Sequence, residues 1–105
     1  MAQFDVHVNA GRSAKLFPYL VIVQSGLLRS WDRCIIVPLS PHAGFFRDPV
    51  MAPTITMHGQ PFHFQAHEIA NVPRSALGRL AGNVSANGDA IIRALDQVLS
   101  RGYPD

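Results

Sequence analysis

Apolar residues gather in two short uninterrupted runs in the first third of the chain, at residues 19–23 and 34–37. Both runs are rich in β-branched side chains and have turn-forming residues outside them, which favours strands over helix. Neither run alternates cleanly between apolar and polar positions. Each predicted strand should therefore bury both faces, under other strands or against a second copy of the chain. The two runs are predicted to form the spine of a small β-rich domain.

The segment that joins these runs, residues 24–33, is polar at its ends but carries Leu27, Leu28 and Trp31. Large apolar side chains are unusual in a solvated loop. Either the connector folds back over the core, or it offers an apolar patch to a partner. Of these two interpretations, the first is the commoner outcome in proteins, and we expect it here.

Strict alternation predicts a third strand at the start of the chain, where Phe4, Val6 and Val8 are separated by polar residues (Asp5, His7 and Asn9). Farther along, residues 54–57 and 62–66 are predicted to form a hairpin around a turn at 58–61. Between the spine and the hairpin, residues 38–53 contain four prolines and are expected to be irregular.

Residues 71–73 introduce a segment that is expected to be a short helix or a loop, with Leu77, Leu80 and Val84 facing the core. A clearer helix follows, with Asn87 as its N-cap and Gly102 and Pro104 as its stop signals. Its apolar stripe is formed by Ile91, Leu95 and Val98, widened on one side by Ile92 and Leu99, and its polar face by Arg93, Asp96 and Gln97.

A hydrophobic fraction of 48% in 105 residues indicates one folded domain over 1–105 rather than a disordered chain. The nine basic residues are scattered and the formal charge is only +2, so direct nucleic-acid binding is not expected. The single cysteine, Cys34, fits a buried thiol in a reducing compartment. No apolar run approaches membrane-spanning length and no signal peptide is visible, so we expect a cytoplasmic protein without membrane contact.

Few residues of the sequence are spaced in a way that suggests catalysis or metal binding. His63 and His67 are four residues apart, but they lie at or beside a predicted strand and not on a helix, on an outer face shared with Gln65. Glu68 adds a carboxylate, yet no Cys pair or HExxH motif supports a metal site. Nucleophile elbows, paired carboxylates and phosphate loops are also absent. The pattern favours a binding protein without cofactor over an enzyme, although ribonucleases can use scattered residues that no spacing rule detects.

The order and spacing of several segments resemble the CcdB family of toxins. These segments are Gln3-Phe4-x-Val6, residues 21–25 (Val-Ile-Val-Gln-Ser), residues 33–39 (Arg-Cys-Ile-Ile-Val-Pro-Leu), Pro53, Gly59, residues 69–73 (Ile-Ala-Asn-Val-Pro), Gly78, Ile91 and Ala94. The resemblance implies a homodimer built on a small SH3-like β-barrel with a C-terminal helix. It further implies the toxin of a type II toxin–antitoxin module, serving plasmid maintenance or a chromosomal stress response. Such a toxin binds the A subunit of DNA gyrase, performs no chemistry, and is neutralised by a CcdA-like antitoxin.

The resemblance also implies a gyrase-binding surface. Its residues are Leu27, Leu28, Asp96, Leu99, Ser100, Arg101, Gly102 and Tyr103. Leu27 and Leu28 stand where the family has an Ile-Ile pair, and Asp96 stands where it has a helix Asn. The family's terminal Trp-Gly-Ile is replaced by Ser100, Arg101 and Gly102. Serine lacks the aromatic surface that makes tryptophan an interface hot spot.

Two other functions remain open at this point. One is a family member that has lost gyrase poisoning and only binds antitoxin. The other is an mRNA-cleaving toxin, because that group of toxins shares the barrel.

Overall fold

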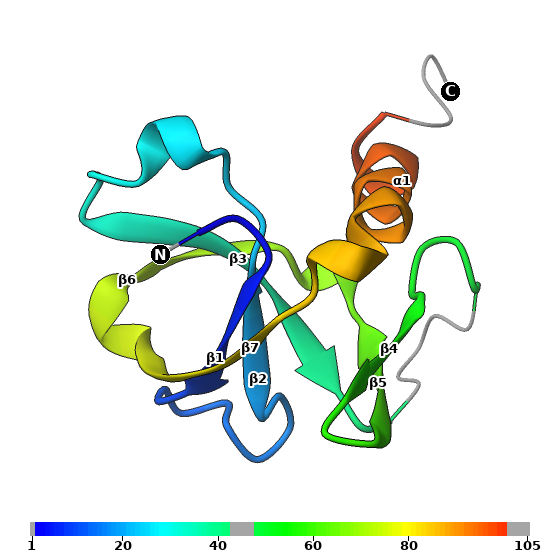
Figure 1. Ribbon diagram of the computed structural model, residues 1–105, viewed down its shortest axis with the longest axis horizontal. Helices are drawn as coiled ribbons and strands as arrows, with labels where there is room; N and C mark the ends of the chain where they lie inside the picture. The colour runs from blue at the N-terminus through cyan, green and yellow to red at the C-terminus, as the bar shows by residue number, and fades with distance from the viewer. Residues whose placement is uncertain (1, 43–47, 101–105) are drawn as a thin grey trace.

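The computed structural model describes residues 2–42 and 48–100. In this part of the chain, seven antiparallel strands form one curled sheet, and a helix packs at one end (Figure 1). The strands are β1 (Asp5–Asn9), β2 (Tyr19–Ile22), β3 (Arg33–Ser40), β4 (Thr54–Met57), β5 (Gln60–Phe64), β6 (Ala70–Pro73) and β7 (Leu77–Asn83), and the helix is α1 (Gly88–Leu99). Short 3₁₀ turns, η1 (Gly26–Leu28), η2 (Ala66–Glu68), η3 (Arg74–Ala76) and η4 (Ser85–Asn87), lie between them. The strand order is β4-β5-β3-β2-β1-β7, with β6 paired to β3.

The predicted spine is confirmed in β2 and β3, which pair with Val21 opposite Val37. Alternate residues of these strands point to opposite faces of the sheet. Val21, Val37 and Leu39 belong to the main hydrophobic cluster, which also contains the hairpin and helix residues. Residues of the other parity form a second, smaller cluster: Leu20, Ile22, Cys34 and Ile36. Both faces of the spine are therefore buried, as the unbroken apolar runs predict.

Strand β3 continues to Ser40, three residues beyond its predicted end. Its outer edge pairs with β6 as far as Ile36 and with β5 from Leu39 onward. Pro38 lies at this change of partner, a position that tolerates a residue without a backbone N–H. The predicted irregular segment therefore begins after Ser40; residues 43–47 of it lie outside the described part of the chain.

The predicted hairpin is confirmed, but its turn is tighter than expected. Strand β5 begins at Gln60, which pairs directly with Met57. The two intervening residues, His58 and Gly59, have φ values of 52° and 78°. Two successive positive φ values are the mark of the two-residue turn that matches the twist of a hairpin. The four-residue turn at 58–61 was the wrong prediction.

The short helix or loop expected after residue 70 is confined to the 3₁₀ turn η3 (Arg74–Ala76), because β6 (Ala70–Pro73) and β7 (Leu77–Asn83) on either side of it are strands. β6 pairs with β3, with Asn71 opposite Ile35, and β7 pairs with β1. Val84 is buried as predicted and Leu77 packs against the second cluster, whereas Leu80 is 58% exposed. The ladder between β1 and β7 contains two register irregularities, around His7.

The same irregularities interrupt the alternation predicted for the first strand. Val6 is fully buried and Val8 only partly, whereas the polar residue Asn9 is buried. The Asn9 side chain donates hydrogen bonds to Ser13 Oγ (3.0 Å) and Phe17 O (2.8 Å) and accepts one from Gly11 N (2.8 Å). It therefore fixes the β1–β2 loop, residues 10–18, against the sheet.

Helix α1 packs Ile91 and Ala94, both fully buried, against the main cluster, with Leu95 and Val98 at the margin. Asn87 occupies the predicted N-cap position but makes no side-chain capping hydrogen bond. Ile92 and Leu99 are 51% and 65% exposed, so they do not widen the buried stripe as predicted. Arg93 and Asp96 are exposed as expected, and the predicted stop signals Gly102 and Pro104 lie outside the described residues.

Candidate binding surface on the β2–β3 connector

The β2–β3 connector presents its apolar side chains to solvent. Leu27 is 92% exposed, Leu28 40% and Trp31 38%, so the expectation that the connector covers the core is wrong. These three side chains, with Ser30 and Ile35, line an open hollow of about 560 Å³. Figure 1 shows the connector projecting from the sheet at the end of β2, well separated from the hairpin. The patch formed by Leu27, Leu28 and Trp31 is called the connector patch below.

Polar contacts hold the connector patch in one shape. The Ser25 hydroxyl accepts a hydrogen bond from the Leu27 N–H (3.1 Å) and caps the short turn η1. Gln24, only 6% exposed, accepts from the Ile35 N–H (3.1 Å) and donates to the Leu28 carbonyl (3.5 Å). The buried amide therefore links both ends of the connector, and the exposed leucines stand on a rigid base.

Two arginines join the connector to β6 and η3. Arg33 donates to both the side-chain and backbone oxygens of Asn71, at 3.0 Å each. The Arg74 side chain donates to the Arg29 carbonyl, and its backbone N–H donates to the Asp32 carbonyl. These contacts attach the connector to strands far along the sequence and surround its apolar centre with positive charge.

The other residues of the expected gyrase surface lie on the helix. Asp96, Leu99 and Ser100 are exposed, and the Ser100 hydroxyl donates to Asp96, with oxygen contacts of 2.7 Å and 2.5 Å. In Figure 1 the end of α1 and the connector both lie in the upper part of the view but are well separated, so one copy does not bring the two groups together. Arg101, Gly102 and Tyr103 lie outside the described residues.

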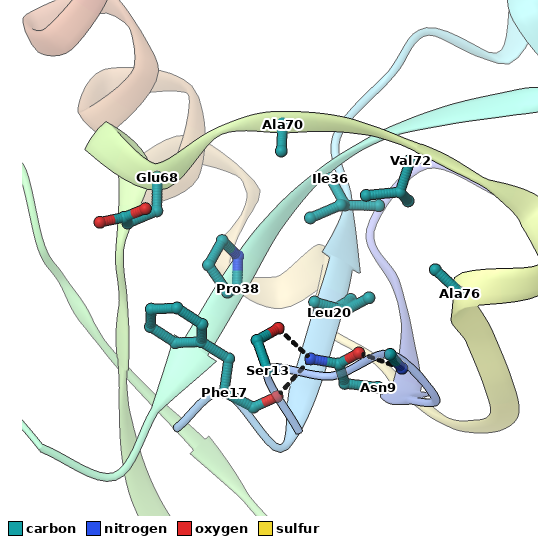
Figure 2. A pocket seen from close by; sticks show the side chains of 11 residues that line it. Asn9, Ser13, Phe17, Leu20, Ile36, Pro38, Glu68, Ala70, Val72 and Ala76 are labelled. Atoms are coloured by element: carbon teal, nitrogen blue, oxygen red, sulfur yellow. Dashed lines mark hydrogen bonds between the residues drawn. The ribbon is translucent and has the colours of Figure 1, made fainter. Parts of the chain in front are cut away.

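Under the β1–β2 loop lies a cavity of about 340 Å³ that the sequence did not reveal (Figure 2). Its walls are mostly apolar, with Leu20 and Ile36 from the spine, Val72 from β6, and the Phe17 ring at one end. Phe17 and Glu68 also line a second hollow of about 120 Å³. The remaining walls of that second hollow are Leu16, Ser40, His42, Gln65 and His67.

The histidines fall in different surroundings from those predicted. His63 lies on β5 and pairs with Ser40 of β3, whereas His67 lies in η2, with its Nε2 atom 3.7 Å from Glu68 Oε1. Gln65, expected on the outer face with both histidines, is buried. The strand ends at Phe64, and the turn that follows redirects Gln65 and His67. Within residues 2–42 and 48–100, no group of three or more His, Cys, Asp or Glu side chains is placed to hold a metal ion.

Cys34 is fully buried in β3, in agreement with the predicted core thiol. Burial raises the pKa of its thiol, which disfavours the reactive thiolate. No helix of the described chain has the length and apolar character needed to cross a membrane.

Three solved structures define the class of the fold. An endoribonuclease in complex with its cognate antitoxin, from a mycobacterial species, aligns with a TM-score of 0.78 at 16% identity, covering 99% of both chains. An endoribonuclease from a mycobacterial species aligns with a TM-score of 0.73 at 16% identity, covering 99% of this chain and 95% of the other. The Mycobacterium tuberculosis toxin MazF-mt6 aligns with a TM-score of 0.68 at 14% identity, covering 90% and 94%. The fold is thus the antiparallel half-barrel with a C-terminal helix that these three proteins share.

The sequence assigns the family within this class. The family model described as CcdB protein matches residues 3–101, nearly the whole chain, and the protein belongs to the CcdB family of toxins. Comparison with curated protein sequences gave no match.

Proposed function

We propose that this protein is the toxin of a type II toxin–antitoxin pair and that it inhibits DNA gyrase by binding its A subunit in the cytoplasm. The family match shows that the chain is a toxin of the CcdB family. The connector patch supports gyrase as the target. It places Leu27, at 92% exposure, on a base fixed by Gln24 and Arg74. Exposed apolar side chains on a preorganised base lose little entropy when a partner covers them.

The proposed contact surface combines the connector patch with the end of α1. We propose a homodimer, in which the second copy covers exposed helix residues outside this surface, such as Ile92. Because one copy holds the connector and the helix end apart, a dimer offers a way to place one copy's connector near the other copy's helix end. Sedimentation analysis tests this directly: a mass twice that of the chain supports the dimer, and a concentration-independent monomer contradicts it.

A CcdA-like antitoxin is the proposed second partner. One of the structural neighbours is described as bound to its cognate antitoxin. The arginines around the connector patch, Arg29, Arg33 and Arg74, supply positive charge for an acidic partner segment.

Whether the end of α1 can contact gyrase distinguishes an active gyrase poison from a family member that only binds antitoxin. Ser100 is exposed and bonded back onto Asp96, so it offers little apolar surface to gyrase. Most of the free energy of binding to gyrase therefore comes from the connector patch in this proposal.

A supercoiling assay with purified gyrase and purified protein tests the proposal. Accumulation of gyrase-dependent cleaved DNA, or loss of supercoiling, supports it. Normal supercoiling at saturating protein, with a Ser100→Trp variant that does inhibit, supports the antitoxin-only alternative instead.

A further inference from the structure

We propose that the cavity under the β1–β2 loop binds a small arylalkylamine, that is, an aromatic ring joined by a short chain to an ammonium group. This cavity of about 340 Å³ is called the loop cavity below. None of the described residues that line it belongs to the connector patch or to helix α1. The inference is therefore independent of the gyrase proposal.

The loop cavity has the size of a small organic molecule. A cavity of about 150 Å³ lined by aliphatic and aromatic side chains is large enough to hold benzene. Pockets that bind small molecules begin at about 300 Å³. At about 340 Å³, the loop cavity has room for one or two fused rings with a short substituent.

The walls around the space for the ring are aliphatic. Leu20 and Ile36, 4% and 3% exposed, line the cavity from the spine, and Val72 lines it from β6. Two alanines, Ala70 and Ala76, lie at its upper and right edges in Figure 2, and their short side chains leave the space between these walls unfilled. An aromatic ring placed here buries its surface against aliphatic carbon, which is the main source of affinity for such a ligand.

Hydrogen bonds hold the β1–β2 loop over this space. The Asn9 side chain, 5% exposed, donates to Ser13 Oγ (3.0 Å) and to the Phe17 carbonyl (2.8 Å), as Figure 2 shows. The Ala10 N–H donates to the Ala76 carbonyl (2.9 Å), which joins the loop to η3. The cavity is therefore preformed, and a ligand does not need to order the loop when it binds.

One end of the loop cavity favours a positive charge. The Phe17 ring and the Glu68 carboxylate lie on the same side of the cavity in Figure 2. An ammonium group at this end can accept both a charge-assisted hydrogen bond with the carboxylate and a cation–π contact with the ring. His67 Nε2 is 3.7 Å from Glu68 Oε1, which is beyond hydrogen-bond distance, so the carboxylate can still accept from a ligand.

The same lining disfavours a negative charge. Glu68 is the only charged side chain among the described residues that line the loop cavity, and no lysine or arginine is among them. A ligand carboxylate would meet Glu68 between apolar walls, with no cation to offset the repulsion. A neutral ring keeps the apolar contacts but lacks the attraction to Glu68. The expected order of affinity is therefore arylalkylamine first, neutral ring second and aryl carboxylate last.

Tryptamine, indole and indole-3-propionate test this order, because they share one ring system and differ in charge. Each is titrated into the full-length protein while NMR follows the amide signals of Val72 and Ala76. Tryptamine should bind at least about 10-fold more tightly than indole-3-propionate. Glu68→Gln should weaken tryptamine binding by about 10-fold and leave indole binding unchanged. Asp89→Asn, which removes a carboxylate from α1, is the matched control and should leave all three affinities unchanged.

Two filling variants locate the binding site. Ala76→Phe should abolish binding of tryptamine and of indole, and Ala70→Phe, at an exposed position of β6, does the same from the other edge of the cavity. Thermal unfolding shows which of the two variants fold. Tryptamine binding that survives in a folded filling variant overturns the proposal, as does equal affinity for tryptamine and indole-3-propionate. Failure of all three compounds to bind the wild-type protein also overturns it and leaves the gyrase proposal intact.

Discussion

The buried Gln24 side chain accepts a hydrogen bond from the backbone N–H of Ile35, at 3.1 Å, across the base of the β2–β3 connector. The same amide donates to the Leu28 carbonyl. A residue at the start of the connector thus fixes both the turn that carries the leucines and the strand that receives the chain. Gln24 lies just after β2, and its buried amide holds the connector patch together with the contacts of Ser25, Arg33 and Arg74.

Replacing Gln24 by the similarly sized Met should destabilise the protein by about 1–3 kcal/mol, because the Ile35 N–H loses its partner. Urea unfolding measures the loss, and hydrogen exchange at the Ile35 amide should accelerate. Gln60→Met, at an exposed position of β5, is the control and should leave stability nearly unchanged. Equal stability of the Gln24 and Gln60 variants would show that the amide does not hold the connector.

Two adjacent isoleucines test how α1 packs. Ile91 is fully buried and Ile92 is 51% exposed. Ile91→Ala should lower the free energy of unfolding by about 2–5 kcal/mol through lost burial and a cavity. Ile92→Ala should change it by only about 0.5 kcal/mol in the monomer. A larger loss at Ile92 than at Ile91 would mean that the helix presents a different face to the sheet.

Asp5 gives a prediction about pH. Partial burial by itself would raise the pKa of Asp5, but hydrogen bonds from the Asn83 side chain and the Ala2 N–H bring it below its usual value. A carboxylate with a lowered folded-state pKa stabilises the fold above its unfolded pKa, and this stabilisation is lost as pH falls through the folded value. The protein should therefore lose part of its stability on acidification below about pH 4.

An NMR titration of the Asp5 carboxyl checks this prediction. Asn83→Ala should raise its pKa, whereas the matched Asn87→Ala should not, since Asn87 makes no bond to Asp5. A wild-type pKa at or above the ordinary aspartate value would contradict the assignment.

Much of the fold could be predicted because its signals are local. The spine strands are unbroken apolar runs, and helix α1 has a clear period. The errors at residues 70–83 have a different origin. Ala70–Pro73 is short and contains a proline, and it is a strand only because the edge of β3 is available to pair with it. Likewise, Asn9 is buried because the β1–β2 loop folds back onto its side chain, a contact between segments that alternation does not encode.

In the candidate sites, too, contacts between distant segments place the side chains, and local sequence patterns do not encode those contacts. Leu27 and Leu28 were identified from the sequence, but apolar character alone favoured a buried position, and their exposure follows from how Gln24 and Arg74 hold the connector outward. His67 was placed on the outer face of a strand, with no partner except Glu68. The early end of β5 turns it into a hollow with Ser40 and His42, which are 27 and 25 positions earlier in the chain.

The central claim is that the connector patch binds gyrase, and Leu27→Asp tests it most directly. Because Leu27 is 92% exposed, this change should leave the free energy of unfolding within about 0.5 kcal/mol of wild type. Burying the new carboxylate against the A subunit should weaken binding by at least about 2 kcal/mol, or about 30-fold. Leu80→Asp, at an exposed leucine of β7, is the matched control. Calorimetric titration of the purified gyrase A subunit with the wild-type protein, Leu27→Asp and Leu80→Asp measures the three affinities. The account predicts loss of binding for Leu27→Asp alone, and equal affinity of all three proteins would contradict it.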